Sequence, residues 1–291
     1  MEEYHKPVLL KETIEMLDLK EDSVVVDTTL GDGGHSEEIL KRIPKGFLIG
    51  IDIDNEAIER AKERLLKVAN NFVVIPGNFK EIVSLVLFYG KAVTHILADL
   101  GVSSLQLDDG SRGFSFMRDG PLDMRMCQPC MRYTAYDVVN TFTEDELRDI
   151  ILYYGEDPFA ERIAKKIVEE RKKKPIETTT ELANIVESVY PKRHRKIHPA
   201  TRTFQAIRIF VNGELDNLKM FLDNAPKVLL SGGRIAIITY HSLEDRLVKQ
   251  AFKNNEYLQI VNKHVIKPSE EEIKENRRAR SAKLRVAEKI K

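Results

Sequence analysis

The stretch from Val24 to Ile43 constrains the fold more than any other part of this sequence. It opens with a short β-branched run that ends at Asp27, which is typical of a buried parallel strand. A glycine-rich turn from Gly31 to His35 follows and leads into a segment whose apolar residues recur at helical spacing. Strand, glycine turn and helix in this order predict a doubly wound α/β domain, in which the backbone approaches a ligand at the start of a helix.

The pattern of strands and helices repeats along the first hundred residues. Three further parallel strands are predicted, at 47–52, 72–76 and 93–99. Asp52 and Asp99 close two of these strands as Asp27 closes the first, and Phe79 follows the remaining one. Because open α/β sheets bind ligands at the carboxyl ends of parallel strands, we expect these four side chains to converge. Phe79 is either an ordinary core aromatic or a packing surface for an adenine ring.

The acidic residues at the strand ends indicate which ligand the glycine turn accepts. A dinucleotide fingerprint would place its third small residue at Ser36, which keeps a nicotinamide-dependent oxidoreductase as one alternative. Asp27 lies immediately before the turn, where a carboxylate suits a cationic ligand better than a pyrophosphate. Asp52 lies where a carboxylate accepts the hydroxyls of an adenosine ribose. The pair favours S-adenosylmethionine, whose sulfonium and ammonium groups are positive.

Composition sets the broad class of the protein. The 291 residues suffice for one large domain or two ordinary ones, and 42% hydrophobic with 32% charged residues indicate a packed core under a charged surface. The sequence has no apolar run as long as a transmembrane helix and no signal-peptide pattern at its start, so we expect a cytoplasmic protein with no membrane partner. Its 46 basic and 46 acidic residues balance, so affinity for nucleic acid would depend on local segregation of charge.

The pattern changes after Asp99. Residues 111–126 combine Gly, Arg, Phe and Met without a period and are typical of a functional loop, and 135–212 have helical spacing throughout. A later strand ending near His241 indicates that the sheet then resumes. We therefore expect one domain, formed by 1–110 and 214–291, that is interrupted by a mainly helical substrate-recognition domain at 111–213.

Positive charge gathers in the predicted helical insertion and near the end of the chain. The basic positions of the insertion are Arg171 to Lys174, Lys192 to Lys196, His198, Arg202 and Arg208. Such runs are either solvated helix faces or phosphate contacts, and their position on both sides of a helix favours phosphate contacts. The basic tail at 276–285 is either a second nucleic-acid contact or a solvated tail.

The two cysteines, Cys127 and Cys130, have the spacing C-x-x-C. Two thiolates supply half of a structural zinc site, and the chain has no second pair to complete it, so we expect no metal site. The motif lies in a loop rather than at a helix start that follows a strand, which argues against a thioredoxin-like role. Two interpretations of these cysteines remain: a pair without function and a local disulfide.

Several segments resemble one family closely, the bacterial methyltransferases that modify the exocyclic N4 of a cytidine in 16S rRNA of the small ribosomal subunit (the RsmH or MraW family). The matching segments are His5–Leu10, Asp27–Ser36, Leu97–Asp108, Arg112–Met126, His198–Asn212, His241–Arg246 and Ala279–Arg285. They are distributed over nearly the whole chain. The sequence departs from the family pattern at Leu105 and Arg277, where proline would be expected, and neither change removes a chemical group.

The resemblance implies an α/β fold of class I, a Rossmann-like sheet of an S-adenosylmethionine-dependent methyltransferase with an inserted helical domain. It also implies S-adenosylmethionine as the methyl donor and 16S rRNA in the small ribosomal subunit as the partner. Carried onto this sequence, the cofactor contacts are Gly33, Gly34, His35, Asp52, Phe79, Asp99 and Gln106. Asp27 and Gly31 join this set from the strand end and the turn described above.

Methylation of cytosine N4 requires help because the amine lone pair is delocalised into the ring. An acceptor for the amino hydrogens would localise that lone pair, and Asp99 is the first candidate, although it could instead hold the cofactor. His241, at the end of the later strand, is a second candidate as a base or a substrate clamp, with a structural role as the alternative. The target base should be splayed from the RNA, and Phe114 or Phe116 could supply a stacking surface.

Two further functional interpretations remain beside the oxidoreductase. A DNA amino-methyltransferase would share the chemistry, but the Asp-Pro-Pro-aromatic form of its motif is absent after Asp99, where Leu100-Gly101-Val102 follows. A non-catalytic RNA-binding ribosome assembly factor would keep a disused cofactor site, and the complete set of strand-end acids argues against that decay.

Overall fold

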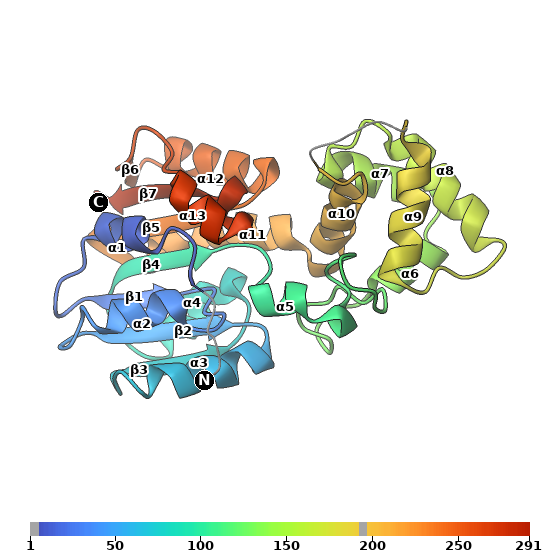
Figure 1. Cartoon of the computed structure of the whole chain (residues 1–291). Coiled ribbons are helices and arrows are strands. Elements are labelled where there is room, and N and C mark those ends of the chain that lie inside the picture. The colour runs from blue at the N-terminus through green and yellow to red at the C-terminus, as the bar shows by residue number, and fades with distance from the viewer. Residues whose placement is uncertain (1–5, 192–196) are drawn as a thin grey trace. The chain divides into compact units, whose positions relative to one another are not determined.

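The computed structural model describes residues 6–191 and 197–291 (Figure 1). His5, with which the first resembling segment begins, and the predicted basic run at 192–196 lie outside the described residues. The chain divides into two compact units: a sheet unit, Met1–Gly101 with Leu215–Lys291, and a helical unit, Val102–Glu214. The expected division after residue 110 comes nine residues earlier in the structure, because Val102 and Leu107 pack against the core of the helical unit.

The described part of the sheet unit forms a seven-stranded sheet with the order β3-β2-β1-β4-β5-β7-β6. The strands are β1 (Val24–Asp27), β2 (Phe47–Asp52), β3 (Phe72–Pro76), β4 (Val93–Asp99), β5 (Leu229–Thr239), β6 (Leu258–Ile260) and β7 (Lys283–Lys289). The first five strands pair in parallel, and β7 runs antiparallel to both β5 and β6. The strand order reverses between β1 and β4, which places a topological switch point at the carboxyl ends of these two strands. The predicted Rossmann-like, class I methyltransferase fold is confirmed.

Helices cover both faces of the sheet. They are α1 (Leu10–Leu17), α2 (Gly34–Leu40), α3 (Asn55–Leu65), α4 (Ile82–Leu87), α11 (Glu214–Val228), α12 (Ser242–Asn254) and α13 (Glu270–Glu275). Alternate strand residues enter different hydrophobic clusters: Val25 packs with residues of α1, α2 and α3, whereas Val26 packs with residues of α4, α11 and α12. Burial on both faces explains why the strands are continuous apolar runs rather than alternating ones.

The helical unit has a hydrophobic core of its own. Its helices are α5 (Ser104–Asp108), α6 (Ala135–Thr141), α7 (Glu144–Gly155), α8 (Ala160–Arg171), α9 (Thr179–Val189) and α10 (Ala200–Asn212). Thr134, Thr143 and Thr178 each begin a helix with a reciprocal capping box, which satisfies the first backbone N–H groups. The core combines aliphatic residues of α6 to α10 with Phe204.

Short 3₁₀ segments and one disulfide complete the described chain. The segments are η1 (Phe79–Glu81), η2 (Gly110–Arg112) and η3 (Arg277–Ser281). Cys127 and Cys130 form a disulfide within a loop of the helical unit, so the local disulfide is the alternative that the structure adopts. In the described ranges, no helix has the length and apolarity needed to cross a membrane.

Candidate active site

The carboxyl end of β1 and the glycine turn form the centre of the site. The Asp27 carboxylate is buried, and it accepts hydrogen bonds from Ser36 Oγ at 2.6 Å and from the Thr29 N–H at 3.2 Å. Gly33 caps α2 in the left-handed conformation, with φ 75°. A Cβ atom added to Gly34 would lie 2.4 Å from Cγ of Pro7, so the segment before α1 packs directly on the turn.

Asp52, at the end of β2, ties the turn to the neighbouring strand. Its Oδ2 accepts the Gly31 N–H at 2.7 Å, and its Oδ1 accepts the Asp54 N–H at 2.9 Å. Each carboxylate oxygen has a second lone pair, which leaves capacity to accept hydroxyl groups of a ligand. Burial raises the pKa of Asp52 to about 6, and burial raises the pKa of Asp27 to about 6 as well.

Asp99, at the end of β4, is the third acid of the cluster. Its Oδ1 accepts the Tyr240 hydroxyl at 2.7 Å, and its backbone N–H donates to Thr29 Oγ1 at 2.6 Å. Burial is the main reason that the pKa of Asp99 rises to about 7; the negative charges of Asp27 and Glu244 add to the rise, and the Tyr240 hydrogen bond opposes it. The side chain is 23% exposed, so a ligand can reach it.

His35 faces the free oxygen of Asp99. Its Nδ1 lies 3.7 Å from Asp99 Oδ2, and its Nε2 lies 3.0 Å from the Val8 carbonyl oxygen. Burial lowers the pKa of His35 to about 4, so the ring is neutral near pH 7 and carries one proton. Since a carbonyl can only accept, that proton is on Nε2, and Nδ1 is an acceptor. When Asp99 is ionised, two acceptor atoms, His35 Nδ1 and Asp99 Oδ2, therefore face each other.

Phe79 follows β3 in η1, as the sequence predicts. Its ring is partly buried and makes an edge contact with Phe221, with ring centroids 5.4 Å apart. The Asn78 side chain accepts the Lys80 N–H at 3.1 Å and so fixes the start of this turn. Phe79 is thus anchored at the same sheet edge as the three acids.

His241 is held as a helix cap rather than presented as a free base. Its Nδ1 accepts the Glu244 N–H at 3.4 Å at the start of α12, and its Nε2 lies 3.1 Å from Glu244 Oε1. The capping box therefore joins His241 to Glu244. Asp245 instead pairs with two basic residues of β7.

Sequence reasoning missed Tyr240 and Glu244. Glu244 is 3% exposed, and its Oε2 accepts the backbone N–H of Tyr240 at 2.9 Å. A signal for Tyr240 was present, because this residue immediately follows β5, the parallel neighbour of β4, and therefore reaches the edge where Asp99 lies.

Three candidates belong to the helical unit. Gln106 is buried and forms the capping box of α5, in which its Oε1 accepts the Ser103 N–H at 3.1 Å. Phe114 is a core residue of the unit, 6% exposed, which corrects its assignment as a stacking surface. Phe116 is only partly buried and lies against His198, with ring centroids 4.6 Å apart.

Several predicted phosphate-binding residues have partners within the protein instead. Arg171 donates to the carbonyl oxygens of Val139 and Phe142, and so satisfies backbone groups at the end of α6. Arg208 forms a two-pronged ion pair with Glu214 at 2.8 and 2.9 Å. These contacts make both arginines structural parts of the helical unit.

The basic tail is also partly structural. Lys283 and Arg285 on β7 pair with the Asp245 carboxylate at 2.8 and 2.7 Å. Arg277 and Arg280 are exposed in η3, so the part of the tail that presents charge to solvent is limited to the residues before β7.

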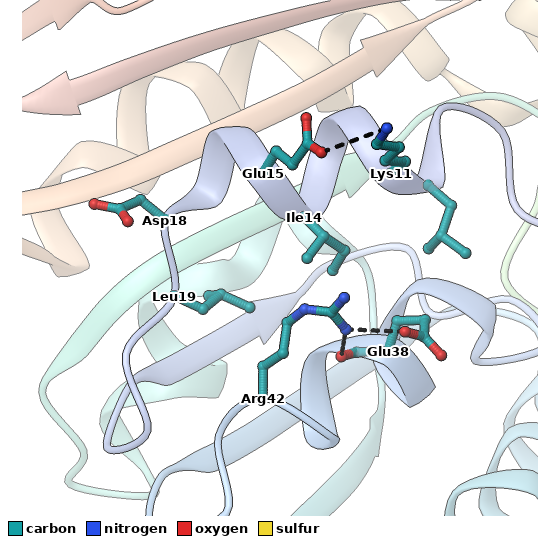
Figure 2. A pocket seen from close by; sticks show the side chains of 8 residues that line it. Lys11, Ile14, Glu15, Asp18, Leu19, Glu38 and Arg42 are labelled. Carbon is teal, nitrogen blue, oxygen red and sulfur yellow. Dashed lines mark hydrogen bonds and ion pairs between the residues drawn. The ribbon is translucent and has the colours of Figure 1, made fainter.

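A separate hollow of about 520 Å³ lies between α1 and α2 (Figure 2). It is lined by Leu10, Lys11, Ile14, Glu15, Asp18, Leu19, Glu38 and Arg42. Among these lining residues, Arg42 and Glu38 are four positions apart and pair with each other at 2.9 Å (Figure 2). The hollow shares no residue with the acidic cluster, so it is not the site that the strand ends form.

Comparisons with known proteins agree along the whole chain. Residues 2–290 match the sequence profile of a family described as the MraW methylase family. The chain is 51% identical over 312 residues to the ribosomal RNA small subunit methyltransferase H of Clostridioides difficile (strain 630), with 100% of both chains covered. It is 49% identical over 293 residues to the protein of the same name from Dictyoglomus thermophilum, with 99% of this chain and 98% of that one covered.

Among solved structures, the chain resembles the crystal structure of PH0851 with a TM-score of 0.51 and 12% identity, covering 99% of this chain and 47% of that one. At this level of identity the likeness concerns the fold alone, and it agrees with the topology of the sheet unit.

Proposed function

The chain belongs to the MraW methylase family, and from this premise we propose that it transfers a methyl group from S-adenosylmethionine to the exocyclic N4 of a cytidine in 16S rRNA of the small ribosomal subunit. The observation that carries the proposal is the cluster of Asp27, Asp52 and Asp99 at the carboxyl ends of β1, β2 and β4, in a chain whose relatives along its full length are named rRNA methyltransferases.

The chemistry of the acidic cluster suits this cofactor. Burial raises the pKa of all three carboxyl groups, so a ligand that brings positive charge would be favoured there. In this proposal Asp52 accepts the ribose hydroxyls, Phe79 packs on the adenine, and the backbone at Gly31, Gly33 and Gly34 lies along the ligand. Asp27 and His35 hold the turn in place, and Gln106 is a further cofactor contact.

The bound cofactor would supply an electrophilic methyl group, and the protein must then align the amine with it. We assign Asp99 Oδ2 as the acceptor for an amino hydrogen of cytosine, which localises the nitrogen lone pair as the new bond forms. Both ring nitrogens of His241 face Glu244, so we assign His241 a positioning role rather than that of a base.

The helical unit is the proposed substrate-recognition domain. Phe116 is partly buried and next to His198, which suits a stacking surface for a splayed base better than the buried Phe114 does. Exposed lysines at the end of α8, such as Lys172 and Lys173, are the candidates for phosphate contact.

The test is transfer of labelled methyl groups from S-adenosylmethionine to purified small ribosomal subunits, to free 16S rRNA and to duplex DNA, followed by nucleoside analysis. We expect label as N4-methylcytidine in ribosomal RNA. Label in DNA would indicate a DNA amino-methyltransferase instead. Tight binding of S-adenosylhomocysteine without transfer to any substrate would contradict the enzymatic proposal and favour a non-catalytic assembly factor.

A further inference from the structure

We propose that Tyr240 is the positioning residue of Asp99: its hydroxyl occupies Oδ1 of the carboxylate and leaves Oδ2 as the acceptor that faces the substrate amine. This inference rests on the proposed function for the identity of the amine, whereas the coupling of Tyr240 to Asp99 rests on the contacts between the two side chains.

Tyr240 is held at three points. Its backbone N–H donates to the buried Glu244 carboxylate at 2.9 Å, and its hydroxyl donates to Asp99 Oδ1 at 2.7 Å. Its ring lies beside Gly101, where an added Cβ would be 3.5 Å from ring atom Cδ2 and where φ is +94°. The ring therefore bridges the ends of β4 and β5 and has little freedom to rotate.

The hydrogen bond between Tyr240 and Asp99 has one direction. Burial raises the pKa of Tyr240 well above its ordinary value of 10, so the hydroxyl keeps its proton and donates. Asp99 must then accept through Oδ1. Its other oxygen points toward Nδ1 of His35, which is itself an acceptor, so Oδ2 keeps a lone pair for a donor from outside the protein.

The hydrogen bond from Tyr240 favours the ionised form of Asp99 in surroundings that are otherwise acidic. The titratable groups that act on Asp99 and Tyr240 are Asp27, His35, Glu244 and Glu272. The acids among them disfavour an ionised Asp99, and the neutral His35 offers no compensating charge. The Tyr240 hydroxyl is the group that opposes them, so its removal should shift Asp99 toward the protonated form, whose O–H oxygen is a much poorer acceptor for the amine than an ionised Oδ2.

The matched variants are Y240F and Y257F. Y240F removes the hydroxyl and keeps the ring against Gly101. Y257F removes a hydroxyl from a tyrosine that is 48% exposed and follows α12, away from the acidic cluster. With labelled S-adenosylmethionine and purified small subunits, we expect Y240F to lower kcat roughly tenfold at pH 7, and to move the acid limb of the kcat profile up by about one pH unit. The KM for S-adenosylmethionine should change little, and Y257F should match the wild type.

A second measurement is independent of activity. Titration of the Asp99 carboxyl carbon by ¹³C NMR, assigned with D99N, should give a higher apparent pKa in Y240F than in the wild type. An unchanged titration would overturn the positioning role, even if methyl transfer is observed. A wild type that transfers no methyl group would overturn the proposed function but leave this titration as a test of Tyr240. If Y240F fails to fold, all tyrosines can be replaced with 3-fluorotyrosine, whose hydroxyl is a stronger hydrogen-bond donor. This replacement should lower the apparent pKa of Asp99. An unchanged pKa of Asp99 would count against the proposal.

Discussion

The Nδ1 atom of His35 lies 3.7 Å from Oδ2 of Asp99, and neither atom carries a proton when the carboxyl group is ionised. Two acceptors in this position favour a donor between them, either a proton on Asp99 itself or an amino group of a bound molecule. Asp27 and Asp52 lie at the same sheet edge, and burial raises the pKa values of all three acids to about 6, 6 and 7, so a cationic ligand that binds near pH 6 would displace protons from this cluster.

The substitution D99N should reduce methyl transfer without disturbing the fold or cofactor binding. The Asn side-chain carbonyl can still accept the Tyr240 hydroxyl, so we expect the variant to fold and to keep S-adenosylhomocysteine binding within a few-fold of the wild type. Methyl transfer should fall roughly 10²–10⁴-fold, because the amide is a much poorer acceptor for an amino proton that becomes acidic during transfer. Single-turnover transfer to small subunits measures this directly, and wild-type turnover in D99N would exclude a chemical role for Asp99.

The raised pKa of Asp99 should make the free energy of unfolding depend on pH. The pKa of Asp99 in the folded protein, about 7, exceeds its ordinary value of 3.8, so the native state binds more protons than the unfolded state between these values. The contribution of Asp99 to stability is thus present at low pH and is lost as the pH rises through 7. We expect the free energy of unfolding of D99N, relative to that of the wild type, to rise by about 2–3 kcal/mol between pH 5 and pH 8. Denaturant titrations at both pH values would measure it; a difference that falls with pH would contradict the assignment.

Cofactor binding should release protons. The positive charges of S-adenosylmethionine favour the ionised forms of Asp27, Asp52 and Asp99, whose pKa values of about 6, 6 and 7 leave them partly protonated near pH 6. Isothermal titration at pH 6 in buffers of different ionisation enthalpy should detect the release, roughly half a proton or more. S-Adenosylhomocysteine, which lacks the sulfonium charge, is the matched ligand and should release fewer protons. Equal release by the two ligands would argue that the sulfonium does not lie near these acids.

The close packing of Pro7 on Gly34 should leave no room for a side chain at position 34. A G34A substitution places a Cβ atom 2.4 Å from Cγ of Pro7, and since α2 begins at this residue, the segment before α1 must move. We expect a loss of about 1–3 kcal/mol in the free energy of unfolding and weaker cofactor binding.

The double variant P7A/G34A provides the control for this contact, because alanine at position 7 lacks the clashing Cγ. It should recover most of the lost stability, giving a coupling energy of about 1 kcal/mol or more in a thermal or chemical denaturation cycle. Strictly additive effects of the two substitutions would show that the clash is relieved elsewhere.

Local sequence patterns determined much of the fold and the core of the candidate site. The β-branched runs and the glycine turn at 31–35 are set by short-range preferences, namely the period of the apolar residues and the backbone freedom of glycine. Because parallel strands place their carboxyl ends on one edge of a sheet, the sequence alone predicts that Asp27, Asp52 and Asp99 lie close together.

Only the tertiary structure decided which partners those residues have. Tyr240 meets Asp99 across 141 positions of sequence, through the register in which β5 lies beside β4. His241 is the N-cap of α12, whose first residue is Ser242, and this role was not predicted from the sequence. The pairing of Tyr240 with Asp99 depends on the distance between segments that are remote in sequence, and no local periodicity encodes it.

The same limit applies to charge. The sequence located the basic runs, but it could not distinguish Arg171, whose guanidinium satisfies the carbonyl groups at the end of α6, from Lys172 beside it, which is exposed. A charged side chain is committed to the interior or available to a partner according to what packs around it, and packing is a property of the folded chain.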